Sequence, residues 1–149
     1  MILVHLNRFP PYNAPVKIRM ELSRILVREL ATCQVIELRE ADGDRTFPIL
    51  IGLPEAQAIE RRLQHIELKR PLTHELLSNV IACFGGTLES ICINDLADTT
   101  FYALLSIRTE EGDLLEIDSR PSDAIALGIA NDVPIFVEEH VLEEAQSEC

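Results

Sequence analysis

Residues 33–52, CQVIELREADGDRTFPILIG, decide the architecture of the N-terminal half. Two apolar runs, CQVIEL and TFPILIG, flank the polar stretch READGDR, in which Asp42-Gly43 favours a tight turn with positive φ. This pattern predicts a β-hairpin. Upstream, residues 16–22 (VKIRMEL) alternate apolar and charged side chains, which is typical of a strand with one wet face. The N-terminal half is therefore predicted to open as an antiparallel sheet.

Two helices are predicted after this sheet. From Pro54 the apolar residues recur three or four positions apart as far as Ile66, which indicates an amphipathic helix whose apolar stripe excludes Arg61 and Arg62. Thr73 is expected to cap a second helix, which ends at the glycine pair 85–86. The apolar face of this second helix is made of five residues: Leu76, Leu77, Val80, Ile81 and Phe84.

The C-terminal half of the sequence has a different order of predicted strands and helices. Three strands are predicted over ESICINDL, TFYALLSI and LLEID, and the turns ADT and EEGD join them. A helix that begins near Pro121, the short strand PIFV and the helix EHVLEEAQ follow. Strands, helices and strands without strict alternation predict an α+β fold. We expect a mixed, mainly antiparallel sheet packed with about four helices in a single compact domain of residues 16–149. Residues 1–15, which include the proline-rich RFPPYNAP, are predicted to be an N-terminal lead-in.

Charge is unevenly distributed along the chain. The formal net charge is −12, and residues 81–149 carry two basic and fifteen acidic side chains. Phosphate affinity comes mainly from Lys and Arg, so any contact with nucleic acid must be local or bridged by a metal cation. The alternative is an acidic surface that only keeps the protein soluble. With no run of eighteen apolar residues and no secretory signal, we expect no membrane segment and a cytoplasmic location.

The cysteine, histidine and glycine patterns in the sequence argue against several kinds of metal, cofactor and catalytic site. Cys33, Cys83 and Cys92 have apolar neighbours and no Cys-x-x-Cys spacing, so we interpret them as small core residues rather than zinc or redox groups. The histidines match no His-Glu-x-x-His pattern. Because dinucleotide, Walker and Gly-x-Ser-x-Gly motifs are absent from the sequence, a nucleotide cofactor and a serine hydrolase are not expected.

Residues 117–131, IDSRPSDAIALGIAN, form the first candidate site. A strand ending at Asp118 and a helix starting after Arg120 would bring Asp118 and Asp123 to one turn, where two carboxylates can hold Mg²⁺. Arg120 would offer two donors to a phosphate at the helix N-terminus. The structural alternative uses the same residues: Asp118 or Ser119 caps the helix, and Asp123 interacts with its dipole.

Two further stretches carry candidate residues. In KRPLTHELL, Arg70 could bind phosphate while His74 serves as a metal ligand or a general acid or base. In IGLPEAQAI, Glu55 could supply another carboxylate. In both stretches the alternative is an ordinary helix start, whose acidic residue in the first turn interacts favourably with the helix dipole. In this alternative His74 is only a solvated side chain.

Four ordered segments resemble the motifs of the bifunctional nuclease domain family. They are FPILIGLPEAQAI, RPLTHELL, INDLADTTFYALL and IDSRPSDAIALGIANDVPIFVEEHVLEEA, and the likeness runs from about Val16 to Ala145. The resemblance implies a compact α+β domain, a homo-oligomer and nuclease activity on DNA and RNA. Nine positions match the family's motifs: Glu55, Arg70, Pro71, His74, Asp118, Arg120, Pro121, Ser122 and Asp123.

Two functions from different classes follow from these observations. The first is a nuclease that depends on Mg²⁺ or Mn²⁺ and hydrolyses phosphodiester bonds of RNA or DNA. Its expected catalytic residues are Asp118, Asp123, His74 and Glu55, its phosphate-binding residues Arg120, Arg70 and Ser122, and its metal ligands Asp118 and Asp123. The second is a non-catalytic, homo-oligomeric binding or regulatory module in which the same motifs are structural.

Overall fold

The predicted hairpin is present in the computed structural model, which describes residues 4–6 and 14–148. Its strands β3 and β4 pair antiparallel, with Gln34 opposite Ile51 and Arg39 opposite Thr46. The predicted positive φ at the turn is wrong, because no positive φ occurs at residues 42 and 43. The turn is instead closed by the Glu40 carboxylate, which accepts hydrogen bonds from the Arg45 backbone and guanidinium.

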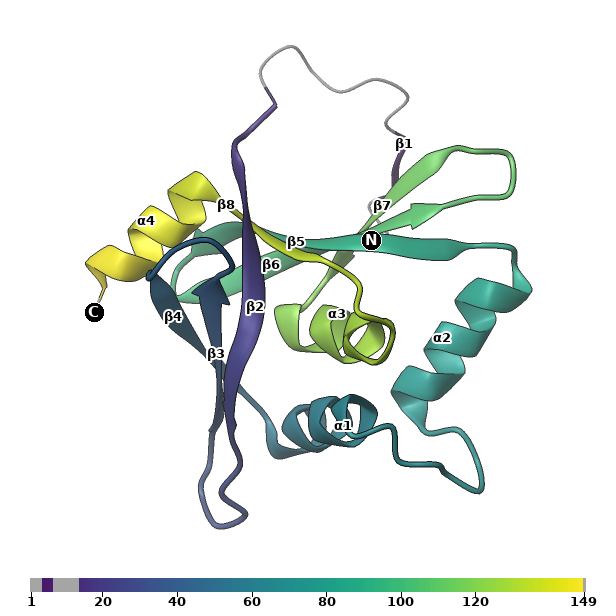
Figure 1. Cartoon of the computed structure of the whole chain (residues 1–149), viewed down its shortest axis with the longest axis horizontal. Coiled ribbons are helices and arrows are strands. Elements are labelled where there is room, and N and C mark those ends of the chain that lie inside the picture. Colours follow the sequence, from purple (N-terminus) through teal and green to yellow (C-terminus); the bar gives the residue numbers. More distant parts are fainter. Residues whose placement is uncertain (1–3, 7–13, 149) are drawn as a thin grey trace.

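The described residues form eight strands and four α-helices, arranged as in Figure 1. The strands are β1 (Val4–Leu6), β2 (Lys17–Leu26), β3 (Gln34–Glu40), β4 (Thr46–Ile51), β5 (Thr87–Ala97), β6 (Thr100–Arg108), β7 (Leu114–Ser119) and β8 (Ile135–Glu138). The helices are α1 (Leu53–Leu63), α2 (Thr73–Cys83), α3 (Pro121–Gly128) and α4 (Glu139–Ser147), and a 3₁₀ turn follows α3 at Ile129–Asn131.

One sheet holds all the described strands, in the order β1-β7-β6-β5-β8-β2-β3-β4. Within the described residues β5 and β8 pair in parallel and every other neighbouring pair is antiparallel. The predicted single α+β domain with a mixed, mainly antiparallel sheet is therefore confirmed. The short edge strand β1 was not predicted, and residues 1–3 and 7–13 of the predicted lead-in lie outside the described residues.

Helix α3 occupies the centre of the helical layer. It packs on β5 and β6 and also contacts α1 and α2 (Figure 1). Residues 124–127 are at most 2% exposed, as the apolar run in the sequence predicted. A side chain at Gly128 would place its Cβ 2.7 Å from Ile91 Cδ1, so only glycine lets the end of α3 approach β5 this closely. The C-terminal end of α3 is thereby held close to the sheet.

The helix caps differ from the predictions. Arg120 is the N-cap of α3, where Asp118 or Ser119 was predicted, and Leu72 is the N-cap of α2, where Thr73 was predicted. Neither cap residue has a side chain that accepts a hydrogen bond from a backbone N–H group of its helix. Pro121, in contrast, occupies the predicted first-turn position. The polar side chains at these helix starts are therefore available for other contacts.

Burial departs from the sequence patterns in helices α1 and α2. Arg62, predicted to lie off the buried stripe, is only 9% exposed, whereas Leu63 and Ile66 at the end of the predicted stripe are exposed. No residue of α2 is buried, although Ile81 is partly buried against the core. The predicted apolar face of α2 thus points mainly to solvent.

The interpretation of three cysteines as core residues holds for one of them. Cys92 on β5 is buried, and burial raises the pKa of its thiol to about 11. Cys33 and Cys83 are exposed, so their prediction as core residues is wrong. Apolar neighbours in the sequence did not predict burial there, because Cys33 lies in the loop just before β3 and Cys83 at the uncovered end of α2. None of the helices described is long and apolar enough to cross a membrane.

Candidate functional site

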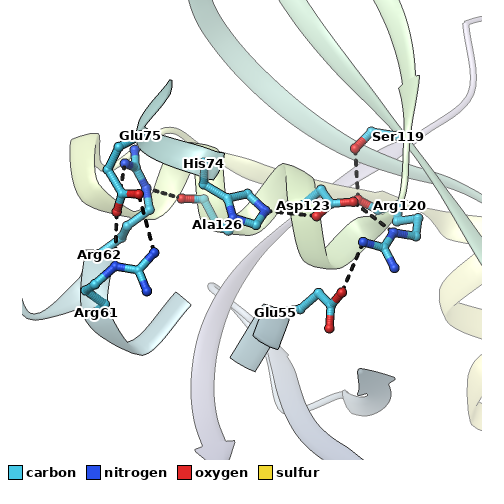
Figure 2. A network of polar contacts seen from close by, with 9 residues as sticks. All are labelled: Glu55, Arg61, Arg62, His74, Glu75, Ser119, Arg120, Asp123 and Ala126. Carbon is cyan, nitrogen blue, oxygen red and sulfur yellow. Dashed lines mark hydrogen bonds and ion pairs between the residues drawn. The ribbon is translucent and has the colours of Figure 1, made fainter. Parts of the chain in front are cut away.

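Three helix starts converge at one place on the structure. Glu55 lies in the first turn of α1, His74 in the first turn of α2 and Asp123 in the first turn of α3. Arg120, the N-cap of α3, completes this group of four, which we call the helix-start cluster (Figure 2). The convergence follows from the packing of α1 and α2 on the central helix α3. Carboxylates are favoured there because helix N-termini carry partial positive charge.

Asp123 is the centre of the helix-start cluster. Its Oδ1 lies 2.9 Å from His74 Nε2, and its Oδ2 accepts a hydrogen bond from Arg120 Nε at 2.8 Å. Arg120 Nη2 also donates to Glu55 Oε1 at 3.2 Å. The chain of contacts is therefore His74, Asp123, Arg120 and Glu55 in that order (Figure 2).

Side-chain exposure is greatest at Arg120 and falls from there toward His74. The Arg120 side chain is 65% exposed, that of Asp123 28% and that of His74 13%. Within the described residues Arg120 Nη1 has no hydrogen-bond acceptor, so this exposed nitrogen can meet an anion from solvent. The cluster is thus neither a closed core nor a set of independent surface charges.

The ion pairs keep Asp123 charged. Partial burial acts to raise the pKa of the Asp123 carboxyl, but hydrogen bonds from Arg120 and His74 outweigh it, so this pKa lies below its ordinary value. The same contact with Asp123 raises the pKa of Arg120. Asp123 is therefore a fixed negative partner that orients the His74 ring.

A neighbouring network was not predicted from the sequence. Glu75, the residue after His74, accepts a hydrogen bond from Arg61 Nε at 3.2 Å and has Arg62 Nη1 3.9 Å away (Figure 2). Arg62 donates in turn to the backbone carbonyls of Ala126 and Leu127 at the end of α3. These contacts connect the start of α2 with the ends of α1 and α3. No local pattern in the sequence distinguishes Arg62 from an ordinary solvated arginine.

The other predicted site residues lie apart from the helix-start cluster. Asp118 sits on β7 opposite Leu104, with an exposed side chain that makes no contact with the cluster among the described residues. Arg70 is exposed in the segment before α2 and has no ion pair in the described part of the chain. Ser122 is 5% exposed and lines a cavity beside Arg120.

This cavity has a volume of about 670 Å³ and lies next to the helix-start cluster. Its lining is largely apolar and includes Phe47, Phe101 and the exposed Cys33, with Arg120 and Ser122 at the side of α3. The two aromatic rings lie with their centroids 5.4 Å apart. A ligand in the cavity would therefore meet mainly apolar walls, with Arg120 among the lining residues.

A family model describes the same residues. The model for the bifunctional nuclease domain matches residues 36–149, which include all the members of the helix-start cluster. The chain belongs to the bifunctional nuclease family. An uncharacterized protein of Mycobacterium tuberculosis, Rv1829, is 45% identical over 111 residues, which is 74% of this chain and 65% of that protein. The present chain thus spans just under two thirds of this relative.

Members of the family named as nucleases are more distant. Bifunctional nuclease 1 of Oryza sativa subsp. japonica is 24% identical over 118 residues, covering 77% of this chain and 36% of the rice protein. Bifunctional nuclease 2 of the same plant is 29% identical over 115 residues, covering 74% and 35% respectively. The matched region is about a third of each rice protein, so their names describe much longer chains.

The described side chains do not fit a preformed metal centre. Within residues 14–148 no three His, Cys, Asp or Glu residues are arranged to hold a metal ion. Of the predicted pair of ligands, Asp118 lies apart, and both carboxylate oxygens of Asp123 are already engaged by His74 and Arg120. Structural metal sites in proteins need more donors, whereas Mg²⁺ at phosphate-processing sites often uses only one or two carboxylates and the substrate phosphate.

The ion pairs of Asp123 predict a pH-dependent contribution to stability. Because the folded-state pKa of Asp123 is depressed, its contribution is complete above the unfolded value of about 3.9 and is lost as the pH falls through the folded value. We expect Asp123→Asn to lower the free energy of unfolding by about 1.5–3 kcal/mol at pH 7 and to match the wild type at very low pH.

Urea denaturation at several pH values measures this difference. Asp118→Asn, a change at an exposed carboxylate just before α3, is the matched control and should have little effect at any pH. A difference between wild type and Asp123→Asn that stays constant as the pH falls would contradict the assignment of these ion pairs.

Proposed function

We propose that this chain is a nuclease that hydrolyses phosphodiester bonds of RNA or DNA at the helix-start cluster. The observation that carries the proposal is the contact of His74 with Asp123, which is itself held by the exposed Arg120. A histidine oriented by a carboxylate can serve as a general base or acid, and an accessible arginine beside it can bind a phosphate. Membership of the bifunctional nuclease family supports this substrate class.

The roles follow from the atoms that remain available. If His74 Nε2 carries the proton that it shares with Asp123, the other ring nitrogen, Nδ1, can accept a proton from the attacking water. The water oxygen forms a bond to phosphorus, the bond from phosphorus to the leaving sugar oxygen breaks, and the leaving oxygen takes up the proton that His74 accepted. Arg120 binds the phosphoryl oxygens through its exposed guanidinium edge, and Glu55 holds this guanidinium in place.

Dependence on Mg²⁺ or Mn²⁺ remains part of the proposal. Because the described residues do not form a preformed centre, the cation would have to arrive with the substrate phosphate. None of the roles given to His74, Asp123 and Arg120 depends on such a cation. Arg70 and Ser122 are retained as proposed phosphate-binding residues. Asp118 lies on β7 apart from the helix-start cluster, so the roles above do not include it, and the experiment below tests whether it is a metal ligand.

The experiment compares three identically purified proteins: wild type, Asp123→Asn and Asp118→Asn. Cleavage of single-stranded RNA and single-stranded DNA is measured with Mg²⁺, with Mn²⁺ and with a chelator. We expect Asp123→Asn to lose at least about 100-fold in rate, while Asp118→Asn stays within a few-fold of the wild type. A loss in both variants would assign Asp118 to the site as well. Equal cleavage by all three proteins would contradict the proposal and indicate a contaminating nuclease.

A second candidate function is a homo-oligomeric binding or regulatory module without catalysis. It is favoured by the way the motif residues pair with one another, since Glu55, Arg120, Asp123 and His74 form a continuous chain of contacts. The fifteen acidic residues after position 80 also disfavour a broad nucleic-acid groove. Under this function the wild type would cleave neither substrate, whereas Asp123→Asn would still show the loss of stability predicted above.

A further inference from the structure

The cavity beside the helix-start cluster follows the free edge of the sheet. Strand β4 is the last strand in the sheet order, so one of its edges pairs with no described strand. Residues 47–52 all line the cavity, although side chains on a strand alternate between its two faces. Another part of the wall is made by residues 99–101 at the turn between β5 and β6. The cavity therefore lies between the edge of β4 and this turn.

The edge of β4 is a poor template for an added peptide strand. The Thr46 carbonyl accepts a hydrogen bond from the Gln146 side chain, so Thr46 directs its backbone groups away from β3. Alternate residues of an antiparallel strand point the same way, and Pro48 and Leu50 therefore do so too. Proline has no N–H group to donate, and the Thr46 carbonyl is already used. Leu50 still offers one N–H and one carbonyl group beside the cavity.

The accessible aromatic surface in the cavity belongs to Phe101. Phe47 is 0% exposed, so its ring is covered by its neighbours, whereas Phe101 is only partly buried. The volume of about 670 Å³ lies within the usual range for small-molecule sites, about 300–1,000 Å³. An apolar cavity with one ring and a few hydrogen-bonding groups suits a planar heteroaromatic ligand. Nucleic-acid bases are such ligands, and they stack on aromatic side chains with little dependence on sequence.

Arg120 connects this cavity with the helix-start cluster, because it lines the cavity and also contacts Asp123. We propose that the cavity holds one unpaired base of a single-stranded nucleic acid whose neighbouring phosphate binds Arg120. The base stacks on Phe101, and the backbone N–H and carbonyl of Leu50 meet its polar edge. This inference rests on the proposed nuclease function and adds a preference for single strands, since a paired base must first leave its stack.

The experiment uses Cys33 as a reporter, because this exposed thiol lines the cavity. Alkylation by iodoacetamide is followed by mass spectrometry for each cysteine separately. A single-stranded pentamer, tested as DNA and as RNA and checked to be intact afterwards, is expected to slow alkylation of Cys33 at least about 5-fold when present well above its Kd. An abasic DNA pentamer and a DNA hairpin without single-stranded ends should not slow it. Cys83, exposed at the end of α2, is the internal control (Figure 1).

Two neighbouring aromatic residues test the stacking contact. Phe101→Leu keeps an apolar side chain but removes the ring, so it is expected to weaken binding of the pentamer at least about 5-fold. Binding of the abasic pentamer should not change. Tyr102→Leu is the matched control, because Tyr102 is 42% exposed and points to the other face of β6. Urea denaturation establishes that both variants are folded.

The outcomes separate the base site from the nuclease. Alkylation of Cys33 at the same rate with and without both pentamers would overturn the base site, as would equal protection by the abasic pentamer. Protection by decanoate but by neither pentamer would assign the cavity to an apolar anion and also overturn it. Cleavage without protection that depends on the bases would overturn the base site alone. Protection without cleavage would support the base site and contradict the proposed nuclease.

Discussion

Replacing His74 with glutamine is expected to reduce the rate of RNA or DNA cleavage by about 100- to 10,000-fold. Glutamine keeps the size and polarity of the side chain and can still contact Asp123, but it cannot carry a proton between water and the leaving group. His74 is only 13% exposed and lies 2.9 Å from Asp123, so its ring has one orientation from which to act. The measurement is kcat with a single-stranded oligonucleotide of defined length.

The control for this prediction is a second histidine outside the site. His65 is exposed after the end of α1, and His65→Gln should leave kcat within about two-fold of the wild type, as surface changes away from a site usually do. Both variants should unfold at urea concentrations close to that of the wild type. Loss of cleavage in His74→Gln that accompanies a general loss of stability would contradict a catalytic role for His74.

Replacing Arg62 with methionine is expected to lower the free energy of unfolding by about 3 kcal/mol. Methionine retains the apolar stem, but the carbonyls of Ala126 and Leu127 lose the donors that Arg62 supplies at the end of α3. These carbonyls belong to a buried helix that water reaches poorly, so their hydrogen bonds are not readily replaced. Burial also lowers the pKa of the Arg62 guanidinium, as expected for a charge held inside the protein.

The preceding arginine supplies the matched comparison. Arg61→Met removes the contacts with Glu75 but no contact with α3, and it should cost no more than about 1 kcal/mol. The denaturation midpoint in urea should therefore fall much further for Arg62→Met than for Arg61→Met, with similar slopes of the transitions. Equal midpoints for the two variants would contradict the role of Arg62 as the side chain that joins α1 to α3.

Much of the fold follows from local sequence patterns. The hairpin of β3 and β4, the strands β5 to β7 and the buried helix α3 are all signalled by apolar periodicity and turn residues. Periodicity does not show which faces meet, however. It marked the apolar side of α2 correctly but could not show that the polar side packs inward, because that depends on contacts with α3 and with the arginines of α1.

The candidate site could be predicted only in part. His74, Asp123, Arg120 and Glu55 were each predicted from helix-start chemistry, yet 49 positions separate His74 from Asp123, and no local pattern specifies that contact. Asp118 illustrates the opposite problem. Asp118 is only five residues from Asp123 in the sequence. Asp118 belongs to a strand, however, in which side chains alternate between the two faces, whereas Asp123 belongs to a helix.

The central claim is that His74 and Asp123 act as one catalytic unit, and a double-variant comparison tests it most directly. Cleavage rates of the same oligonucleotide are measured for wild type, His74→Gln, Asp123→Asn and the double variant, all purified identically. Residues that act as a unit are strongly non-additive, so the double variant should be no more than a few-fold slower than the slower single variant. The claim would be contradicted if the fold-reduction in rate of the double variant equals the product of the two single reductions. Equal rates for all four proteins would also contradict it.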